Sequence, residues 1–172
     1  MNKKHITLIF IFCILFSSCK KDKNYNSCQN FVQNFYDWYV PATLDESGIL
    51  ASNVAIKEKE YKFDPILLGL LKEESKKHFK KNGDISGLDF DPFLATQDPY
   101  PKYNVLKATI KNDICFAEIE AMSLSGVWKG VSVVVELKFN EGEWRFKNFH
   151  YGRTKDKADE NLIDLLKEIV KI

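Results

Sequence analysis

One stretch in the second half of the chain decides the fold. Residues 115–121 read CFAEIEA, and residues 131–139 read VSVVVELKF. Apolar side chains recur at every second position in both runs, which is the period of a β-strand with one buried face. The turn dipeptide Ser125-Gly126 lies between the runs and predicts a hairpin.

The same alternation continues on both sides of this hairpin. The residues that carry it are Leu106, Ala108 and Ile110 before the hairpin and Trp144 and Phe146 after it. Asn112-Asp113 and Glu141-Gly142 stand where the connecting turns are needed. From Lys102 onward the sequence therefore predicts four antiparallel strands with one buried face.

Other segments have helical spacing. In residues 27–40 the apolar side chains at that spacing are Phe31, Val32, Phe35, Trp38 and Tyr39. Ser27 is expected to cap this helix and Pro41 to end it, a second helix should follow the N-cap Asp64, and a last one lies within residues 158–172. The sequence therefore predicts an α+β domain, with N-terminal helices packed on a curved, mainly four-stranded antiparallel sheet plus a C-terminal helix.

The N-terminus has the features of an export signal, because Lys3 and Lys4 precede an apolar run. That run is too short to span a bilayer, which takes about 20 apolar residues. Its end, Ser17-Ser18-Cys19, resembles the lipobox of bacterial lipoproteins, whose cysteine is acylated and becomes the new N-terminus. An ordinary signal peptide with an unmodified Cys19 is the alternative.

This pattern predicts a signal peptide at 1–18, a lipidated tether at 19–26 and a single domain at 27–172. The protein is then expected in the cell envelope, anchored to a bacterial membrane through the lipid on Cys19, on the periplasmic or the surface side.

Charge excludes one class of partner. The chain has 25 Lys and Arg against 24 Asp and Glu, and removal of residues 1–18, with Lys3 and Lys4, leaves 23 against 24. Because nucleic-acid binding depends on a basic excess that neutralises phosphates, no nucleic-acid partner is expected.

Two cysteines, Cys28 and Cys115, remain once the signal and the lipidated cysteine are set aside. An exported pair can form a disulfide, although buried free cysteines are common too. The histidines that remain, His78 and His150, do not stand at metal-ligand spacing with other His or Cys residues, so no metal or cofactor is expected.

Candidate binding residues in the first half of the chain lie in two segments. Trp38 and Tyr39 form an aromatic pair that is more typical of a core than of a ligand site. In residues 87–98 the candidates are Asp89, Asp91, Gln97 and Asp98, because clustered carboxylates bind cations or share protons. The simpler interpretation makes Asp91 the N-cap of a one-turn helix and Asp98 a turn residue.

The remaining candidates lie in the sheet. By alternation Trp144, Asn148 and His150 share one side of the fourth strand, where the inner face turns polar and a pocket would open. His150 is a candidate general base, and a structural histidine is the alternative. Trp128, in the hairpin from Ser123 to Gly130, is a candidate partner contact unless it folds back onto the sheet.

Several motifs together resemble the family called domain of unknown function 3828. They are Asp89-Phe90-Asp91-Pro92-Phe93-Leu94 with Gln97-Asp98, preceded by Phe35-Tyr36-Asp37-Trp38-Tyr39 and followed by Gly142-Glu143-Trp144-Arg145-Phe146. The resemblance runs roughly from Gln29 to Tyr151. It implies a cystatin-like, nuclear-transport-factor-2-like cone, in which a curved sheet wraps helices and often leaves a pocket, and it implies an envelope lipoprotein. It brings no catalytic residue.

Two functions compete on these observations. The first is a non-enzymatic binding domain whose concave face holds a small ligand or a partner protein, in a specific form an immunity or inhibitor protein. The second is a small isomerase- or hydrolase-like enzyme that uses His150 or Asp89 as a base.

Overall fold

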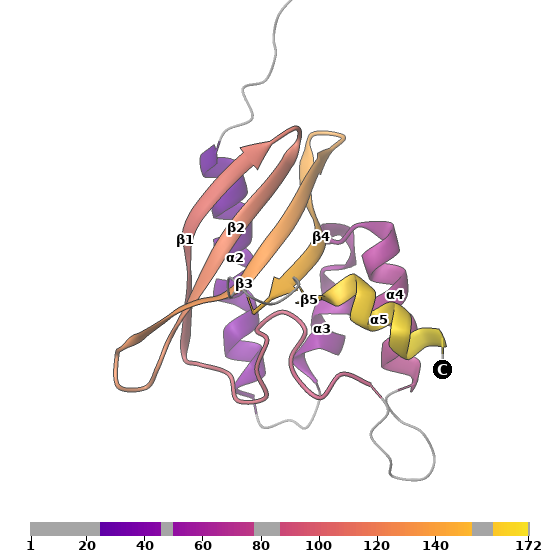
Figure 1. Cartoon of the computed structure of the whole chain (residues 1–172), viewed down its shortest axis with the longest axis horizontal. Coiled ribbons are helices and arrows are strands. Elements are labelled where there is room, and N and C mark those ends of the chain that lie inside the picture. The colour runs from indigo at the N-terminus through magenta and orange to yellow at the C-terminus, as the bar shows by residue number, and fades with distance from the viewer. Residues whose placement is uncertain (1–24, 46–49, 78–86, 153–159, 172) are drawn as a thin grey trace, which may run out of the picture.

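Five antiparallel strands form one sheet in the order β1-β2-β3-β4-β5, and helices cover it (Figure 1). The computed structural model describes residues 25–45, 50–77, 87–152 and 160–171. The helices are α2 (Tyr25–Thr43), α3 (Ala51–Glu58), the 3-10 turn η1 (Glu60–Lys62), α4 (Pro65–Lys77) and α5 (Leu162–Lys171). The strands are β1 (Lys102–Lys111), β2 (Ile114–Met122), β3 (Trp128–Asn140), β4 (Glu143–Tyr151) and β5 (Glu160–Asn161). The predicted α+β fold is confirmed, with β5 as a short addition.

The core lies between α2 and the inner face of the sheet. That face includes Cys115, Ala117, Ile119 and Ala121 of β2, all fully buried, as the alternation predicts. Phe35 of α2 lies at the centre of an aromatic cluster, with its ring 4.7 Å from that of Phe146 and 5.6 Å from that of Phe93. These rings are part of the hydrophobic core on the side of the sheet that α2 covers.

Bulges change which face the strand residues occupy. Strand β4 has one extra residue opposite β3. The neighbours Glu136 and Leu137 of β3 pair with Asn148 and Phe146, which are two positions apart in β4. Past that point the buried apolar residues of β4 are Phe149 and Tyr151, and His150 between them faces outward. The prediction that His150 shares a face with Trp144 and Phe146 is wrong, because a bulge shifts the alternation by one residue.

Similar irregularities affect two other positions. The pairing of β1 with β2 shifts register after Val105. The pairing of β2 with β3 shifts register after Ile119. They leave Leu106 and Val131 exposed, where simple alternation places both on the buried face.

The helix termini follow the sequence in part. Asp64 Oδ1 accepts a hydrogen bond from the backbone N–H of Ile66 at 2.9 Å, so the predicted cap of α4 is confirmed. Helix α2 starts at Tyr25, before Ser27, and continues through the exposed Pro41 to Thr43. A proline ring removes one backbone donor, and here the helix runs only two residues further.

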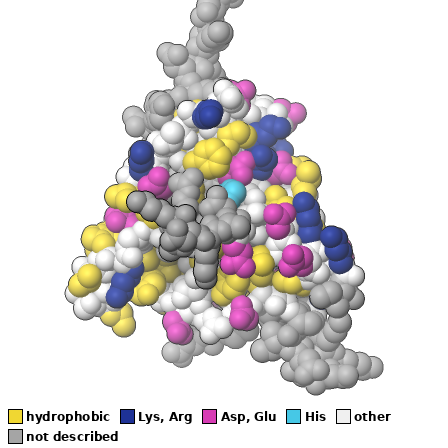
Figure 2. Space-filling model, in the orientation of Figure 1, with side chains coloured by type: hydrophobic (Ala, Val, Ile, Leu, Met, Phe, Trp, Pro, Cys, Tyr) yellow, Lys and Arg dark blue, Asp and Glu magenta, His cyan; other side chains and the backbone are white. Residues whose placement is uncertain are grey.

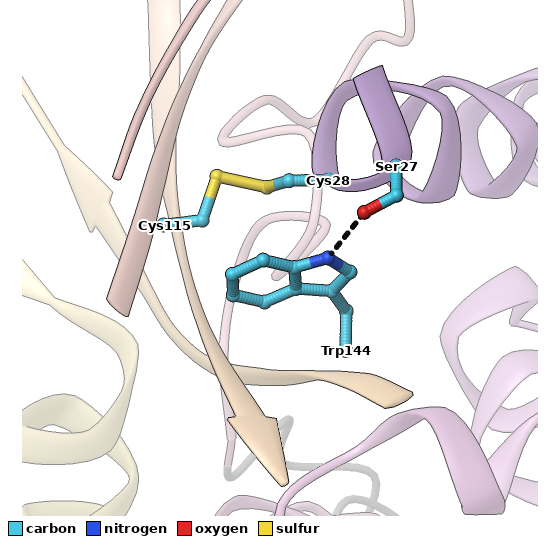
Figure 3. Close-up of a disulfide and its surroundings, with 4 residues drawn as sticks. All are labelled: Ser27, Cys28, Cys115 and Trp144. Atoms are coloured by element: carbon cyan, nitrogen blue, oxygen red, sulfur yellow. Dashed lines mark hydrogen bonds between the residues drawn. A yellow bond between two sulfur atoms is a disulfide. The ribbon is translucent and has the colours of Figure 1, made fainter. Parts of the chain in front are cut away.

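A disulfide ties the N-terminal end of α2 to the sheet. Cys28 and Cys115 are joined with an S–S distance of 1.98 Å across 87 residues of sequence (Figure 3). Beside the disulfide, Trp144 Nε1 donates a hydrogen bond to Ser27 Oγ at 3.0 Å. Of the two states left open for the cysteine pair, the structure has the disulfide.

Strand β1 forms one edge of the sheet, and α2 covers part of that edge. The side chain of Gln33 donates to the carbonyl of Tyr103 at 3.1 Å and accepts from the N–H of Val105 at 2.9 Å. The strand also carries three lysines and a bulge, features that discourage a further strand from pairing there.

The expected signal at 1–18 and the lipidation site Cys19 lie outside the described residues. None of the helices in the described part of the chain has the length and hydropathy that crossing a membrane would require.

Candidate functional site

A groove of about 520 Å³ lies between α3, α4 and the segment 87–99. Its apolar lining includes Leu50, Ile56, Leu71, Leu88, Phe90 and Pro92, and its polar lining includes Asn53, Glu74, Ser75, Asp89, Asp91 and Gln97. Three of the sequence candidates, Asp89, Asp91 and Gln97, therefore come together on one groove.

Asp91 caps the turn that forms one wall of the groove. Its Oδ1 accepts hydrogen bonds from the N–H groups of Phe93 at 2.9 Å and Leu94 at 3.0 Å, which is the geometry of an N-cap. Its backbone carbonyl accepts from Ala95 at 2.9 Å, and its N–H donates to Thr96 at 2.9 Å. The simpler interpretation of Asp91, a cap, is thus confirmed.

Three tyrosine hydroxyls hold the same turn. Tyr39 donates to Asp91 Oδ2 at 2.5 Å, Tyr36 donates to the carbonyl of Phe93 at 2.8 Å, and Tyr151 donates to the carbonyl of Pro92 at 2.6 Å. Two of these tyrosines come from α2 and one from β4. The turn is therefore fixed by side chains distant in sequence.

Burial raises the pKa of Asp91 to about 6, although the bonds from Tyr39, Phe93 and Leu94 act in the opposite direction. Asp91 also raises the pKa of Tyr39, whose largest cause is burial of the phenol. Both carboxylate oxygens of Asp91 accept hydrogen bonds that hold the turn, Oδ1 from Phe93 and Leu94 and Oδ2 from Tyr39. The geometry favours a structural role.

The other candidates in this segment, Asp89, Gln97 and Asp98, are exposed. Asp89 and Gln97 line the groove. Asp98 is not among the residues that line the groove. It lies in a turn, where its N–H donates to Thr96 Oγ1 at 3.1 Å and its carbonyl accepts from the same hydroxyl at 3.0 Å. This matches the turn role expected for Asp98.

The three candidates on β4 do not form a pocket together. Trp144 packs into the core beside the disulfide, and it also lines a second, smaller cavity of about 320 Å³ with Phe31 and Lys62. Asn148 Oδ1 accepts from the N–H of Ile163 at 3.1 Å and so caps the first turn of α5.

His150 lies on the outer face of the sheet. Its Nε2 is 3.1 Å from Glu136 Oε2, and Lys147 Nζ is 2.6 Å from the other oxygen of Glu136. The bond with His150 is the largest cause that lowers the pKa of Glu136. The partner that sequence could not identify is thus a carboxylate of the neighbouring strand.

The aromatic pair on α2 belongs to the core and its margin. Tyr39 is fully buried, and its ring stacks on that of Phe35 at 5.3 Å. Trp38 is half-buried, with Lys59 Nζ 4.8 Å from its ring centre.

A further candidate surface, only partly indicated by sequence, is the end of the β2–β3 hairpin. Its apolar residues, here called the hairpin surface, are Met122, Leu124, Val127, Trp128 and Val131. Leu124 is 93% exposed and Val127 is 57% exposed. The hairpin projects at the lower left of Figure 1, and Figure 2 shows hydrophobic side chains gathered there.

Hydrogen bonds fix the shape of this tip. The N–H of Ser123 donates to the carbonyl of Val127 at 2.9 Å, and that of Gly126 donates to the carbonyl of Ser123 at 2.9 Å. Gly126 has φ +77°, which favours glycine. The signal that could have identified this surface is an apolar pair, Leu124 and Val127, flanking a turn dipeptide that is normally polar.

Within the residues that the structure describes, no three His, Cys, Asp or Glu side chains are grouped in a way that could hold a metal ion.

Comparison with solved structures places the fold beside that of a bacterial complex. The chain is similar to a chain of the type VI native effector-immunity complex Tae3-Tai3 from Ralstonia pickettii, with a TM-score of 0.53 and 19% identity over 77% of this chain and 99% of that one. A SeMet structure of the Tae3-Tai3 complex from the same organism matches with a TM-score of 0.49 and 18% identity over 75% and 98% of the two chains. At this identity the first likeness shows the α+β fold.

No protein-family model matches the chain, and comparison with curated proteins finds no match. The resemblance to the domain of unknown function 3828 therefore stays a prediction.

Proposed function

We propose that this protein is a partner-binding protein of the immunity type, which binds an effector protein in the cell envelope and neutralises it. The observation that carries the proposal is the likeness to one chain of an effector-immunity complex. The match covers 99% of that chain. The bond of the candidate base His150 to Glu136 on the outer face of the sheet also favours binding over base catalysis.

The hairpin surface is the interface that the geometry favours. Exposed apolar side chains on a projecting, hydrogen-bonded tip can enter a recess on a partner without a large loss of conformational entropy. The side chains of Leu124 and Val127 are exposed, and a cluster of exposed apolar residues typically marks an interaction site.

The edge of the sheet is a poorer candidate. Strand addition requires free backbone groups on β1, but the side chain of Gln33 already bonds Tyr103 and Val105 there. Recognition by side chains of the hairpin surface is therefore preferred over pairing of main chains.

The proposed anchor is compatible with this interface. The N-terminal end of α2 lies at the opposite end of the domain from the hairpin tip (Figure 1). Cys19 precedes Tyr25 by six residues, so a lipid on Cys19 would hold the α2 end near the membrane and leave the hairpin facing away from it.

The test is affinity capture with the full chain, extracted from its own membrane in detergent, as bait. Wild type is compared with a Leu124→Asp/Val127→Asp variant and with Ile66→Asp, a control at an exposed apolar residue of α4. We expect one stoichiometric protein that wild type and the control retain and the hairpin variant loses.

The captured protein is then produced in the envelope of a susceptible bacterium. Growth arrest that wild type relieves and the hairpin variant does not would support the immunity function. Capture that is indifferent to the hairpin substitutions would refute the interface, and a captured protein without toxicity would refute the immunity function.

A further inference from the structure

The cavity of about 320 Å³ beside Trp144 lies at the end of the sheet opposite the hairpin surface. Its lining comes from α2, η1 and the hairpin of β3 and β4, which contributes Gly142 at its turn (Figure 1). Aromatic side chains form much of the wall, and they belong to Phe31, Tyr61, Phe139 and Trp144. The volume is at the lower end of the range that is typical of small-molecule sites, about 300–1,000 Å³.

Packing and a hydrogen bond hold the inner part of this wall. The ring of Phe31 is 5.1 Å from that of Phe146 in the core, and the ring of Trp144 is 5.0 Å from that of Phe139. Trp144 Nε1 donates to Ser27 Oγ beside the disulfide (Figure 3). The cavity therefore offers a preformed apolar surface on which a flat ring can pack.

Two opposite charges line the same cavity. Lys62 Nζ is 4.3 Å from the ring centre of Phe31 and 5.5 Å from that of Tyr61. Glu143 is exposed and lies directly before Trp144 in the sequence. Within the residues that the structure describes, Lys62 and Glu143 do not form an ion pair with each other. A ligand that carries both charges can therefore bridge them.

The pKa of Lys62 agrees with an ammonium group that packs on rings. Burial is the largest cause that lowers this pKa, and nearby Lys59 acts in the same direction, while Glu143 acts in the opposite one. A ligand carboxylate beside Lys62 would favour the charged lysine and raise its pKa again.

From this arrangement we propose that the cavity binds a free α-amino acid with an aromatic side chain. Its carboxylate binds Lys62, its ammonium group binds Glu143, and its ring packs on the aromatic wall. A zwitterion is favoured over an aromatic acid or an aromatic amine, because it complements both charges of the lining. This inference concerns a site other than the hairpin surface and does not depend on the immunity function.

The probe is L-phenylalanine, compared with three analogues. They are 3-phenylpropionate, which lacks the ammonium group, 2-phenylethylamine, which lacks the carboxylate, and glycine, which lacks the ring. Calorimetry on the full chain measures the affinities, and NMR chemical shifts locate the site. We expect L-phenylalanine to shift the indole N–H of Trp144 and the amide of Gly142 and to leave the amide of Leu124 unmoved. Each analogue should bind at least about tenfold more weakly.

Two substitutions test the charges separately. Lys62→Met keeps an apolar side chain beside Phe31, and Glu143→Gln changes an exposed residue, so the domain should stay folded in both variants. Each should weaken the binding of L-phenylalanine about tenfold. The matched controls Lys111→Met and Glu141→Gln, at exposed residues outside the cavity lining, should leave it unchanged.

Four results would overturn the inference. They are no binding of L-phenylalanine, an analogue that binds as tightly as L-phenylalanine, chemical shifts confined to other surfaces, and unchanged affinity in either cavity variant.

Discussion

The phenol of Tyr39 donates a hydrogen bond of 2.5 Å to Asp91 Oδ2, and this bond connects α2 to the wall of the groove 52 residues later. Tyr39→Phe would leave a buried carboxylate oxygen without its donor, at a cost of about 1–3 kcal/mol in unfolding free energy. Urea unfolding measures the loss. Tyr61→Phe, at a 59% exposed ring, is the control and should change stability by less than about 0.5 kcal/mol.

The same carboxyl predicts a pH dependence. Because the pKa of Asp91 rises to about 6 on folding, the folded state takes up a proton before the unfolded state does as the pH falls. The contribution of Asp91 to stability therefore increases from pH 7 down to about pH 4, by up to roughly 3 kcal/mol.

Asp91→Asn isolates this contribution, since its amide oxygen still caps the turn and its amide nitrogen can donate to Tyr39. The difference in unfolding free energy between wild type and Asp91→Asn should shift in favour of wild type as the pH is lowered from 7.5 to 4.5. Parallel pH curves for the two proteins would contradict the assignment.

The disulfide predicts a redox-dependent stability. Cys28→Ala/Cys115→Ala removes a bridge that closes a long loop, which typically costs about 2–5 kcal/mol. Denaturant unfolding with and without reductant measures it. Reductant should destabilise wild type and leave the double variant unchanged, and an unchanged wild type would show that the bridge does not form.

Gln33 predicts a defect at the sheet edge. Gln33→Ala removes two hydrogen bonds from the backbone of β1, so we expect about 1–3 kcal/mol of lost stability and self-association through the opened edge. Thermal melting and sedimentation velocity measure the two effects. Asn34→Ala, at the exposed neighbour on α2, should show neither.

The proposed anchor has its own test. Wild-type protein should partition into the membrane fraction and carry the added mass of acyl chains at Cys19. Cys19→Ser should appear in the aqueous fraction without that mass. Membrane association that survives this substitution would argue for another means of attachment.

Local sequence was enough to place the four long strands, their hairpin turns and the caps Asp64 and Asp91. Cys115, Ala117, Ile119 and Ala121 alternate and are all buried, because side chains two apart in a strand must share a face. Asn112 and Asp113 adopt positive φ angles of 49° and 69°, and Gly142 has φ 90°, which are the conformations that tight hairpins demand. The caps Asp64 and Asp91 bond backbone groups within three residues.

The candidate site was only partly predictable. Asp89, Asp91 and Gln97 were identified as a group because they are close in sequence, and they do share a groove. The assignment of His150 to the inner face was wrong because a bulge is an event of pairing between β3 and β4, which one strand's pattern does not record. Leu124 was not singled out because its 93% exposure depends on how far the hairpin projects.

By itself the sequence determined the α+β class, the hairpin turns and the caps Asp64 and Asp91, since each depends on neighbours within a few residues. Only the tertiary structure decided that Tyr36, Tyr39 and Tyr151 hold one turn and that Cys28 is joined to Cys115. It also decided that a groove of about 520 Å³ forms between α3, α4 and the segment 87–99. Those features join residues dozens of positions apart. Their energies come from burial and from hydrogen bonds between distant segments, which form once the helices pack on the sheet.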